Sequence, residues 1–207
     1  MAEHPEARLK TESWYIVDAD PGAVVYLDVT DGTTVEDVAA VMGTRGFVPL
    51  VGERPAVPGA FHLVPAGLFH ARGAGTFVAE VQTPSDTTYR IYDWADEYGR
   101  APRQLHAAAS MGSIILDPEG AFSLDSVDRQ GVREHVTTDY YWMREHQVDS
   151  GTSDLAQAPG PIVLNVTRGS VRLGDLELPK GTTVVVPASS SVSDFEGDGA
   201  VVLEMGF

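Results

Sequence analysis

The sequence predicts an all-β protein, built as a β-sandwich or as jelly-roll barrels, with one or two short helices. Three observations support this fold class. Short apolar segments follow one another along nearly the whole chain, turns that contain Gly or Pro separate them, and helical periodicity is rare. Short strands at near-regular spacing with turn residues between them are typical of sandwiches and barrels.

The first half of the chain contains five segments that we predict to be strands. They are residues 14–19, 23–29, 60–64, 75–83 and 87–94. Asp20-Pro21-Gly22 form the turn between the first two, because Pro and Gly set the backbone angles of a tight turn. Two short helices are expected, at 34–42, where Thr34 caps the start and Gly43 ends it, and at 105–112.

The second half repeats the pattern of the first more weakly. Residues 117–131 and 149–161 are predicted to be loops, and short strands with Gly-containing turns follow to residue 207. Both halves contain an apolar strand, then Val-Pro-Ala, then a Gly-rich turn and a second strand, which indicates a repeated β-fold. We therefore expect two lobes, residues 1–116 and 117–207.

The charge balance restricts the partners that this chain can bind. The 207 residues carry 30 acidic and 14 basic side chains, a net charge of −16. Such a chain has no excess of Lys or Arg to replace counterions on phosphates, so we expect neither nucleic-acid binding nor docking on anionic membranes. An anionic small molecule would need a basic pocket of its own.

The residue types that are absent narrow the chemistry further. There are no cysteines, which excludes disulfides, thiolate metal sites and cysteine nucleophiles. A metal would have to be held by His, Glu, Asp or Gln. The first residues are polar, and no apolar run approaches the ~20 residues of a membrane span. We therefore expect a cytoplasmic protein.

Two side chains of the first half stand where a barrel would hold a ligand. His70 follows the Pro65-Ala66-Gly67 turn at the mouth of the predicted barrel, and Glu12 immediately precedes a strand. A catalytic zinc site commonly has three protein ligands and one open position. His4 and His62 are the nearest candidates for the third, although the turn before His70 breaks the face that His62 would share with it.

Each of these residues also has a structural interpretation. Glu12 is by default a solvated residue at a strand edge, and Lys10 a surface lysine. Alternation in the predicted strand 87–94 sets Arg90 opposite Tyr89, on a solvated face or in an ion pair with Asp86 or Asp93. Arg100 and Arg103 are expected to be solvent-facing loop residues. Three other histidines are expected to be structural: His106, His135 and His146.

Four segments occur together in this order: KTESWYIVDADPGA, VPAGLFHARGAG, EVQTPSDTTYRIYDW and GRAPRQLH. In combination they resemble the type I phosphomannose isomerases, cupin-fold enzymes that interconvert mannose 6-phosphate and fructose 6-phosphate. The resemblance covers residues 9–115 best, and SDTTYRIYDW is its most specific part. The second half is similar, more weakly, to the metal-free cupin lobe of the shorter bacterial members.

The resemblance implies roles for individual residues. Glu12 matches the metal-binding Glu of the KTE motif, and His70 the metal-binding His of the PAGxxHA motif. Lys10 matches the active-site lysine, and Arg90 the active-site arginine. The implied fold is a pair of jelly-roll cupins, and the implied cofactor is one divalent metal, most typically Zn²⁺. A sugar phosphate is the implied substrate.

The chain departs from the family before the KTE motif. Only nine residues precede Lys10, where the family has further strands and a QxHP motif with two more metal ligands. Ala2-Glu3-His4-Pro5 keeps the His-Pro, so His4 is either the third ligand or a coincidence. The shortening leaves two alternatives to the isomerase: a metal-binding cupin of altered function, or a non-catalytic sugar-binding protein. An exposed sheet edge left by the missing strands would favour a homodimer.

Overall fold

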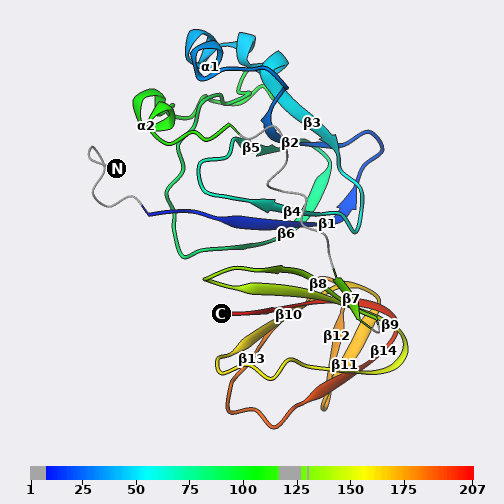
Figure 1. Cartoon of the computed structure of the whole chain (residues 1–207). Coiled ribbons are helices and arrows are strands. Elements are labelled where there is room, and N and C mark those ends of the chain that lie inside the picture. Colours follow the sequence, from blue (N-terminus) through cyan, green and yellow to red (C-terminus); the bar gives the residue numbers. More distant parts are fainter. Residues whose placement is uncertain (1–7, 117–126, 130) are drawn as a thin grey trace. The chain divides into compact units, whose positions relative to one another are not determined.

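The structure, a computed structural model, describes residues 8–116, 127–129 and 131–207 (Figure 1). The chain divides into two compact units, Met1–Ser123 and Leu124–Phe207. The all-β prediction is confirmed, because antiparallel strands are the main regular structure of both units and the helices are few and short. The division lies outside the described residues, so the expected lobe boundary at residue 116 stays a prediction.

The first unit contains two three-stranded antiparallel sheets. One has the order β4-β1-β6 and the other the order β3-β2-β5. The strands are β1 (Glu12–Ala19), β2 (Val24–Val29), β3 (Val51–Pro55), β4 (Phe61–Val64), β5 (His70–Arg72) and β6 (Thr76–Gln82). Apolar side chains of both sheets meet in one cluster, which includes Trp14 and Ile16 from β1 and Val25 and Leu27 from β2. Burial of these side chains holds the two sheets together.

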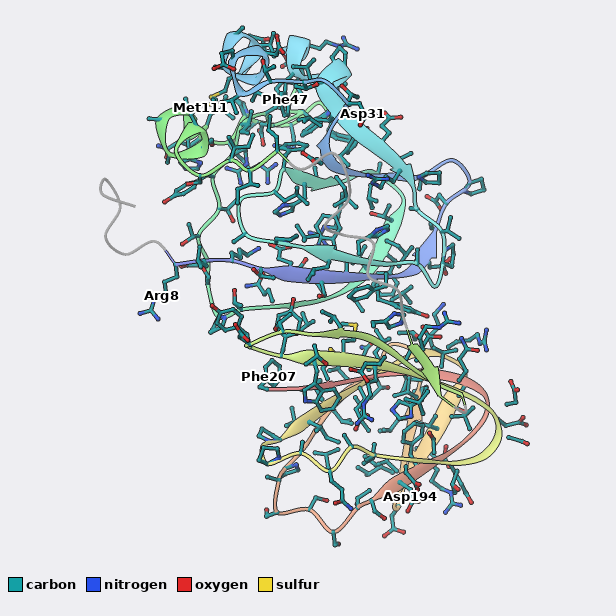
Figure 2. All side chains as sticks on the ribbon, in the orientation of Figure 1. Arg8, Asp31, Phe47, Met111, Asp194 and Phe207 are labelled. Atoms are coloured by element: carbon teal, nitrogen blue, oxygen red, sulfur yellow. The ribbon has the colours of Figure 1, made fainter. Side chains whose placement is uncertain are left out.

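Short helices close one end of the first unit. Helix α1 (Val35–Val41) begins at Thr34, whose side chain accepts a hydrogen bond from the Asp37 backbone while the Asp37 carboxylate accepts one from the Thr34 backbone. This reciprocal capping satisfies donors that a helix start leaves open. The 3₁₀ helix η1 (Arg45–Leu50) and α2 (Ala107–Met111) follow. Phe47 is fully buried, and Met111 packs against the same cluster (Figure 2). The helices expected at 34–42 and 105–112 are confirmed.

The strand predicted at 87–94 is wrong, because this segment is an irregular loop. Its backbone bonds to scattered partners instead of a neighbouring strand. The Arg90 N–H donates to the His106 ring, the Arg90 carbonyl accepts from the His106 backbone, and the Ile91 carbonyl accepts from Gly43. Trp94 then takes a left-handed conformation with φ of 51°, which a strand does not tolerate. The alternation argument for Arg90 therefore fails.

The second unit is organised around one long strand. Its strands are β7 (Val127–Arg129), β8 (Val132–Thr137), β9 (Trp142–Asp154), β10 (Ile162–Arg168), β11 (Ser170–Leu173), β12 (Leu176–Pro179), β13 (Thr183–Val186) and β14 (Asp194–Gly206). Strand β14 pairs with β9, β10 and β11. The loop predicted at 149–161 is wrong up to Asp154, because β9 continues through that residue in register with β14.

Two of the histidines expected to be structural lie inside the second unit. The fully buried His146 accepts or donates at both ring nitrogens, 2.9 Å from Glu204 Oε2 and 2.8 Å from Ser153 Oγ. The other carboxylate oxygen of Glu204 accepts a hydrogen bond of 2.6 Å from the Ala156 backbone. His135 lies 2.9 Å from the buried Glu145. Buried polar groups need such partners, since an unpaired one costs the full desolvation energy.

No helix within residues 8–116, 127–129 and 131–207 combines the length and the apolar character that crossing a bilayer requires.

We predict that Glu204→Ala lowers the free energy of unfolding by about 3 kcal/mol, because it leaves His146 and the Ala156 N–H buried without their acceptor. Chemical denaturation followed by circular dichroism measures this change. Glu196→Ala is the matched control on the same strand. Glu196 is half exposed, and its ion pair among the described residues is with Arg172 on the surface, so its loss should cost less than about 1 kcal/mol. Equal midpoints for the two variants would contradict the prediction.

Candidate functional site

A cavity of about 680 Å³ lies in the first unit. It is lined by the start of β1, the start of β5 and the loop that runs from residue 87 to residue 103. Four residues singled out in the sequence, Lys10, Glu12, His70 and Arg90, all line it. The fifth, His4, lies outside the described residues. The cavity is therefore the place to examine for chemistry.

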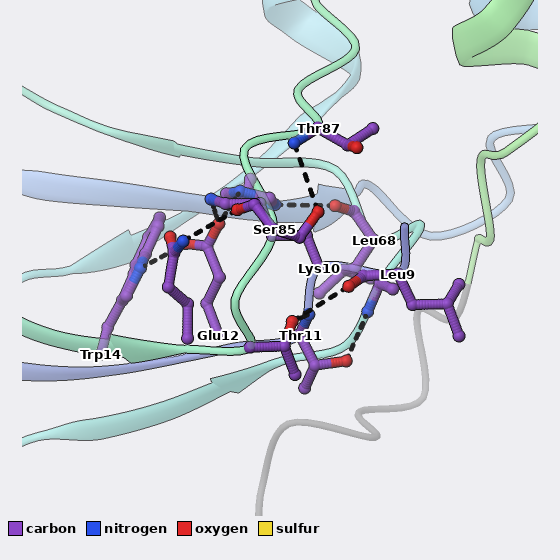
Figure 3. Close-up of polar contacts among 12 residues, drawn as sticks. Leu9, Lys10, Thr11, Glu12, Trp14, Leu68, Ser85 and Thr87 are labelled. Carbon is purple, nitrogen blue, oxygen red and sulfur yellow. Dashed lines mark hydrogen bonds and ion pairs between the residues drawn. The ribbon is translucent and has the colours of Figure 1, made fainter. Parts of the chain in front are cut away.

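The carboxylate of Glu12 is at the centre of the polar contacts in this cavity. Glu12 is the first residue of β1 and only 2% exposed. Trp14 donates its indole N–H to Glu12 Oε2 over 3.0 Å, and Lys10 forms an ion pair with Oε1 (Figure 3). The structural interpretation of Glu12 as a solvated edge residue is wrong, because the side chain is buried among these partners.

His70 faces the same carboxylate from the opposite sheet. Its Nδ1 lies 2.8 Å from the Leu68 carbonyl, and its Nε2 lies 3.5 Å from Glu12 Oε1. A carbonyl only accepts hydrogen bonds, so Nδ1 carries a proton. Nε2 then faces Glu12 as a donor when it is protonated, and presents a lone pair for a metal when it is not. The Trp14 ring packs edge-on against the imidazole with centroids 5.4 Å apart. The ring orientation is thus set from two sides.

Glu12 is held in its charged form. Burial alone would raise the pKa of this carboxyl, but the hydrogen bond and charge of His70, together with those of Lys10, lower it to about 2. A carboxylate with so low a pKa is ionised throughout the physiological range. It is therefore suited to binding a cation and unsuited to donating a proton.

The Glu12 and His70 donors fit a divalent metal in type and in spacing. In a tetrahedral site with bonds of about 2.1 Å, two donor atoms lie roughly 3.4 Å apart, close to the 3.5 Å between His70 Nε2 and Glu12 Oε1. The hydrogen bond from Nδ1 to a carbonyl is the outer contact that metal-binding histidines commonly make. Among the described residues no three His, Asp or Glu side chains converge, and His62 does not line the cavity.

The residues before β1 are held in place by the loop that follows β6. Ser85 Oγ donates to the Arg8 carbonyl, and the Arg8 N–H donates to Thr87 Oγ1. Thr83 Oγ1 donates to the Leu9 carbonyl, and the Thr87 N–H donates to Ser85 Oγ (Figure 3). These hydrogen bonds fix Lys10 beside the loop that carries Arg90. Sequence reasoning missed Thr83 and Ser85, although both lie in the QTPSDTTYR segment.

Arg90 reaches the cavity from an irregular loop. Its side chain is one-fifth exposed, donates from Nη1 to the Gln104 carbonyl over 3.0 Å, and has Nε 3.5 Å from Asp93 Oδ1. His106, expected to be structural, accepts the Arg90 backbone N–H at its Nδ1 over 3.1 Å. Of the two ion pairs considered for Arg90, the structure forms the one with Asp93.

Asp93, Arg100 and Arg103 are cavity residues that sequence reasoning missed. Both arginines were expected to face solvent from a loop, and both are exposed loop residues, but each also pairs with Asp93. Arg100 Nη1 lies 2.9 Å from Asp93 Oδ2, and Arg103 Nε lies 2.6 Å from Oδ1. The two arginines lie close together in the GRAPRQLH segment. Because residues 87–94 were predicted to be a strand, the turn that brings Asp93 to these arginines was not expected.

Aromatic side chains form one wall of the cavity. Tyr26 stacks on Trp94 with centroids 5.4 Å apart, and Tyr92 meets Trp94 edge-on at 4.8 Å. Phe69 lies 6.3 Å from the same ring. An apolar wall next to a few oriented polar groups is typical of small-molecule sites.

The cavity has the opposite charge balance to the whole chain. Its lining includes six of the 14 basic residues of the chain against three acidic ones, Glu12, Glu80 and Asp93. The six are Arg8, Lys10, Arg72, Arg90, Arg100 and Arg103. In a chain with a net charge of −16, this is the basic pocket that an anionic ligand would need.

No family model matches the chain, but individual proteins do. It is 28% identical over 204 residues to the mannose-6-phosphate isomerase of Streptococcus mutans, covering 95% of this chain and 64% of that protein. It is 28% identical over 199 residues to mannose-6-phosphate isomerase ManA of Bacillus subtilis, covering 91% of this chain and 62% of that protein. The chain thus spans less than two thirds of the length of these curated relatives.

The fold agrees with the sequence comparison. The crystal structure of the mannose 6-phosphate isomerase from Bacillus subtilis superposes with a TM-score of 0.78 and 25% identity, covering 96% of this chain and 65% of that one. Both units of the chain are included in a match of this extent. In sequence and in its cupin-like fold, this chain is therefore related to the mannose-6-phosphate isomerases, in agreement with the type I family that its motifs resemble.

Proposed function

We propose that the chain is a metal-dependent aldose–ketose isomerase that interconverts mannose 6-phosphate and fructose 6-phosphate. The observation that supports this most is the cationic cavity, which places Lys10 and Arg90 in the same pocket as the ionised Glu12 and the oriented His70. The relatives with this activity supply the substrate class.

The metal of this proposal is one divalent cation, most typically Zn²⁺, held by Glu12, His70 and, as the third protein ligand, His4. Such a cation supplies Lewis-acid polarisation of the sugar carbonyl when it is bound. Carboxylate oxygen and imidazole nitrogen are both donors that zinc accepts. The spacing of Nε2 and Oε1 described above supports the assignment of two of these three ligands.

The side chains around the metal donors have separate tasks in this proposal. Lys10 and Arg90 provide positive charge where negative charge develops as a proton moves between C1 and C2 of the sugar. Glu12 stays ionised and keeps Lys10 oriented by their ion pair. The aromatic wall around Trp94 offers a flat apolar surface against which the C–H groups of a sugar can pack.

We predict that the purified chain supplied with Zn²⁺ converts mannose 6-phosphate to fructose 6-phosphate, and that a chelator abolishes the turnover. A coupled enzymatic assay for fructose 6-phosphate measures this, and re-addition of Zn²⁺ should restore the rate. Stoichiometric zinc without any conversion would contradict the isomerase and leave a metal-binding cupin of altered function. Sugar-phosphate binding without metal or turnover would leave a non-catalytic sugar-binding protein.

We also predict that His70→Ala abolishes stoichiometric binding of zinc, because it removes one of the two donors that the described residues bring together. Metal analysis after dialysis against a defined zinc buffer measures the bound ion. Glu80→Gln is the matched control, since Glu80 lines the same cavity but has no place in the ligand set. Unchanged metal content in the His70 variant would show that the site assignment is wrong.

A further inference from the structure

The two metal donors of the proposed site stand on different sheets. Glu12 begins β1 in the sheet β4-β1-β6, and His70 begins β5 in the sheet β3-β2-β5. Their donor atoms nevertheless lie 3.5 Å apart, and a shift of either strand end would change this distance. The geometry of the pair therefore depends on contacts that fix the start of β1 against the start of β5.

The chain passes from one sheet to the other through the turn Pro65-Ala66-Gly67. This turn directly follows β4, whose last residue pairs with Glu12. The Leu68 backbone N–H donates to the Pro65 carbonyl over 3.1 Å, which closes the turn. The Leu68 carbonyl then lies 2.8 Å from His70 Nδ1 and orients the imidazole. The position of the turn thus determines where the Nε2 of His70 points.

Thr11, the residue directly before Glu12, attaches this turn to the start of β1 (Figure 3). Its Oγ1 accepts a hydrogen bond of 3.2 Å from the Ala66 backbone N–H. Its backbone is fixed as well, because the Thr11 N–H donates to Thr83 Oγ1 over 3.2 Å and the Thr11 carbonyl accepts from the Thr83 N–H over 3.0 Å. Thr11 does not line the cavity, so its hydroxyl serves this contact and not a ligand.

A second set of contacts restricts the same turn. The Gly67 carbonyl accepts a hydrogen bond of 2.9 Å from the Ile115 N–H, and Leu68 forms a parallel bridge with Ile115. Gly67 has a φ of 94°, a left-handed conformation that glycine adopts readily. A Cβ at this position would lie 2.6 Å from the Ser113 carbonyl oxygen. The turn therefore has little room to move, and Thr11 ties it to the residue next to the carboxylate.

We propose that Thr11 is a positioning residue for the metal site, and that its hydroxyl sets the distance and the angle between the donors of Glu12 and His70. Glu12 is joined covalently to Thr11, whose hydroxyl reaches Ala66. Two residues later the Leu68 carbonyl meets His70 Nδ1. Contacts of this outer kind hold ligands in the orientation that a metal requires, and their loss commonly weakens metal binding about 10–100-fold. The inference rests on the proposed function in placing a metal at this pair, but its test needs no turnover.

The test compares the zinc affinity of Thr11→Val and Thr11→Ser in the full chain. Thr11→Val keeps the outline of the side chain but removes the acceptor for the Ala66 N–H, so we expect the dissociation constant for zinc to rise at least about tenfold. Thr11→Ser keeps the hydroxyl and should stay within about threefold of the unchanged chain. Competition with a chromophoric chelator measures both constants in the absence of substrate.

Thr44→Val is the matched control. Thr44 Oγ1 also accepts a backbone N–H, that of Gly46, over 3.2 Å, but Thr44 is exposed and does not line the cavity. This variant should leave the zinc affinity unchanged. An equal loss of affinity in Thr44→Val and Thr11→Val would overturn the proposal, because the effect would then follow from any lost threonine hydrogen bond.

A cobalt(II) spectrum separates positioning from general support of the fold. The visible absorption bands of Co²⁺ bound in place of zinc depend on the number and the geometry of its ligands. We expect Thr11→Val to shift or weaken these bands in protein whose circular dichroism is unchanged. A lower melting temperature with unaltered bands and unaltered zinc affinity in the folded protein would overturn the proposal. If Thr11→Val does not fold, Thr11→Ala takes its place, since it removes the same acceptor without setting a methyl group beside the Ala66 N–H.

The outcomes also separate this inference from the proposed function. Zinc binding that Thr11→Val weakens, in a chain without isomerase activity, would support the positioning role and contradict the isomerase. Turnover by the unchanged chain, together with an unaltered zinc affinity in Thr11→Val, would overturn the positioning role and leave the proposed function standing.

Discussion

The buried carboxylate of Glu12 is the constraint on which the first unit depends. A charge removed from water is costly unless it is paired and hydrogen-bonded, so the fold must bring Lys10, Trp14 and His70 to it. Each partner needs a support of its own. The hydrogen bonds of Thr83 and Ser85 hold the segment of Lys10, the Leu68 carbonyl orients His70, and the core between the two sheets seats Trp14.

The loop from residue 87 to residue 103 has the opposite constraint, because it brings several positive charges close together. Three arginines in one place repel one another. They stay together because Asp93 accepts hydrogen bonds from Arg100 and Arg103 and lies 3.5 Å from Arg90 Nε. Asp93 thus holds cationic side chains on one side of the cavity, and Glu12 would attract a metal cation on the other side. The two carboxylates divide the cavity into a part suited to metal and a part suited to an anion.

The sequence predicted the strands and helices well and the loops poorly. Strands such as Glu12–Ala19 and the helix capped by Thr34 follow from local patterns, so they could be located before the structure was known. The loop at 87–94 has the same β-branched and aromatic composition as a strand, yet its backbone bonds go to His106 and Gly43, which lie far away in sequence. The residues next to this loop in the sequence give no indication of such distant partners.

Prediction of the candidate site likewise succeeded for some residues and failed for others. The motifs that resemble the isomerase family singled out Lys10, Glu12, His70 and Arg90, and the structure brings all four to one cavity; their roles stay predictions. Asp93, Arg100 and Arg103 were missed because a loop arginine is usually solvated, and only the turn at Trp94 reveals that these two share an acceptor. The net charge also hid the basic pocket, since a total of −16 for the whole chain does not show a local excess of basic side chains.

The position of β14 in the chain order has a consequence for how the second unit is made. Strand β14 follows β9, β10 and β11, all of which pair with it. Contacts between residues so far apart in sequence form slowly, since long loops must close first. During synthesis these partners therefore leave the ribosome with open edges, and edges of that kind can pair with other chains. Partly folded states with unpaired strand edges are prone to aggregation, so completion of β14 is the step that removes this risk in the second unit.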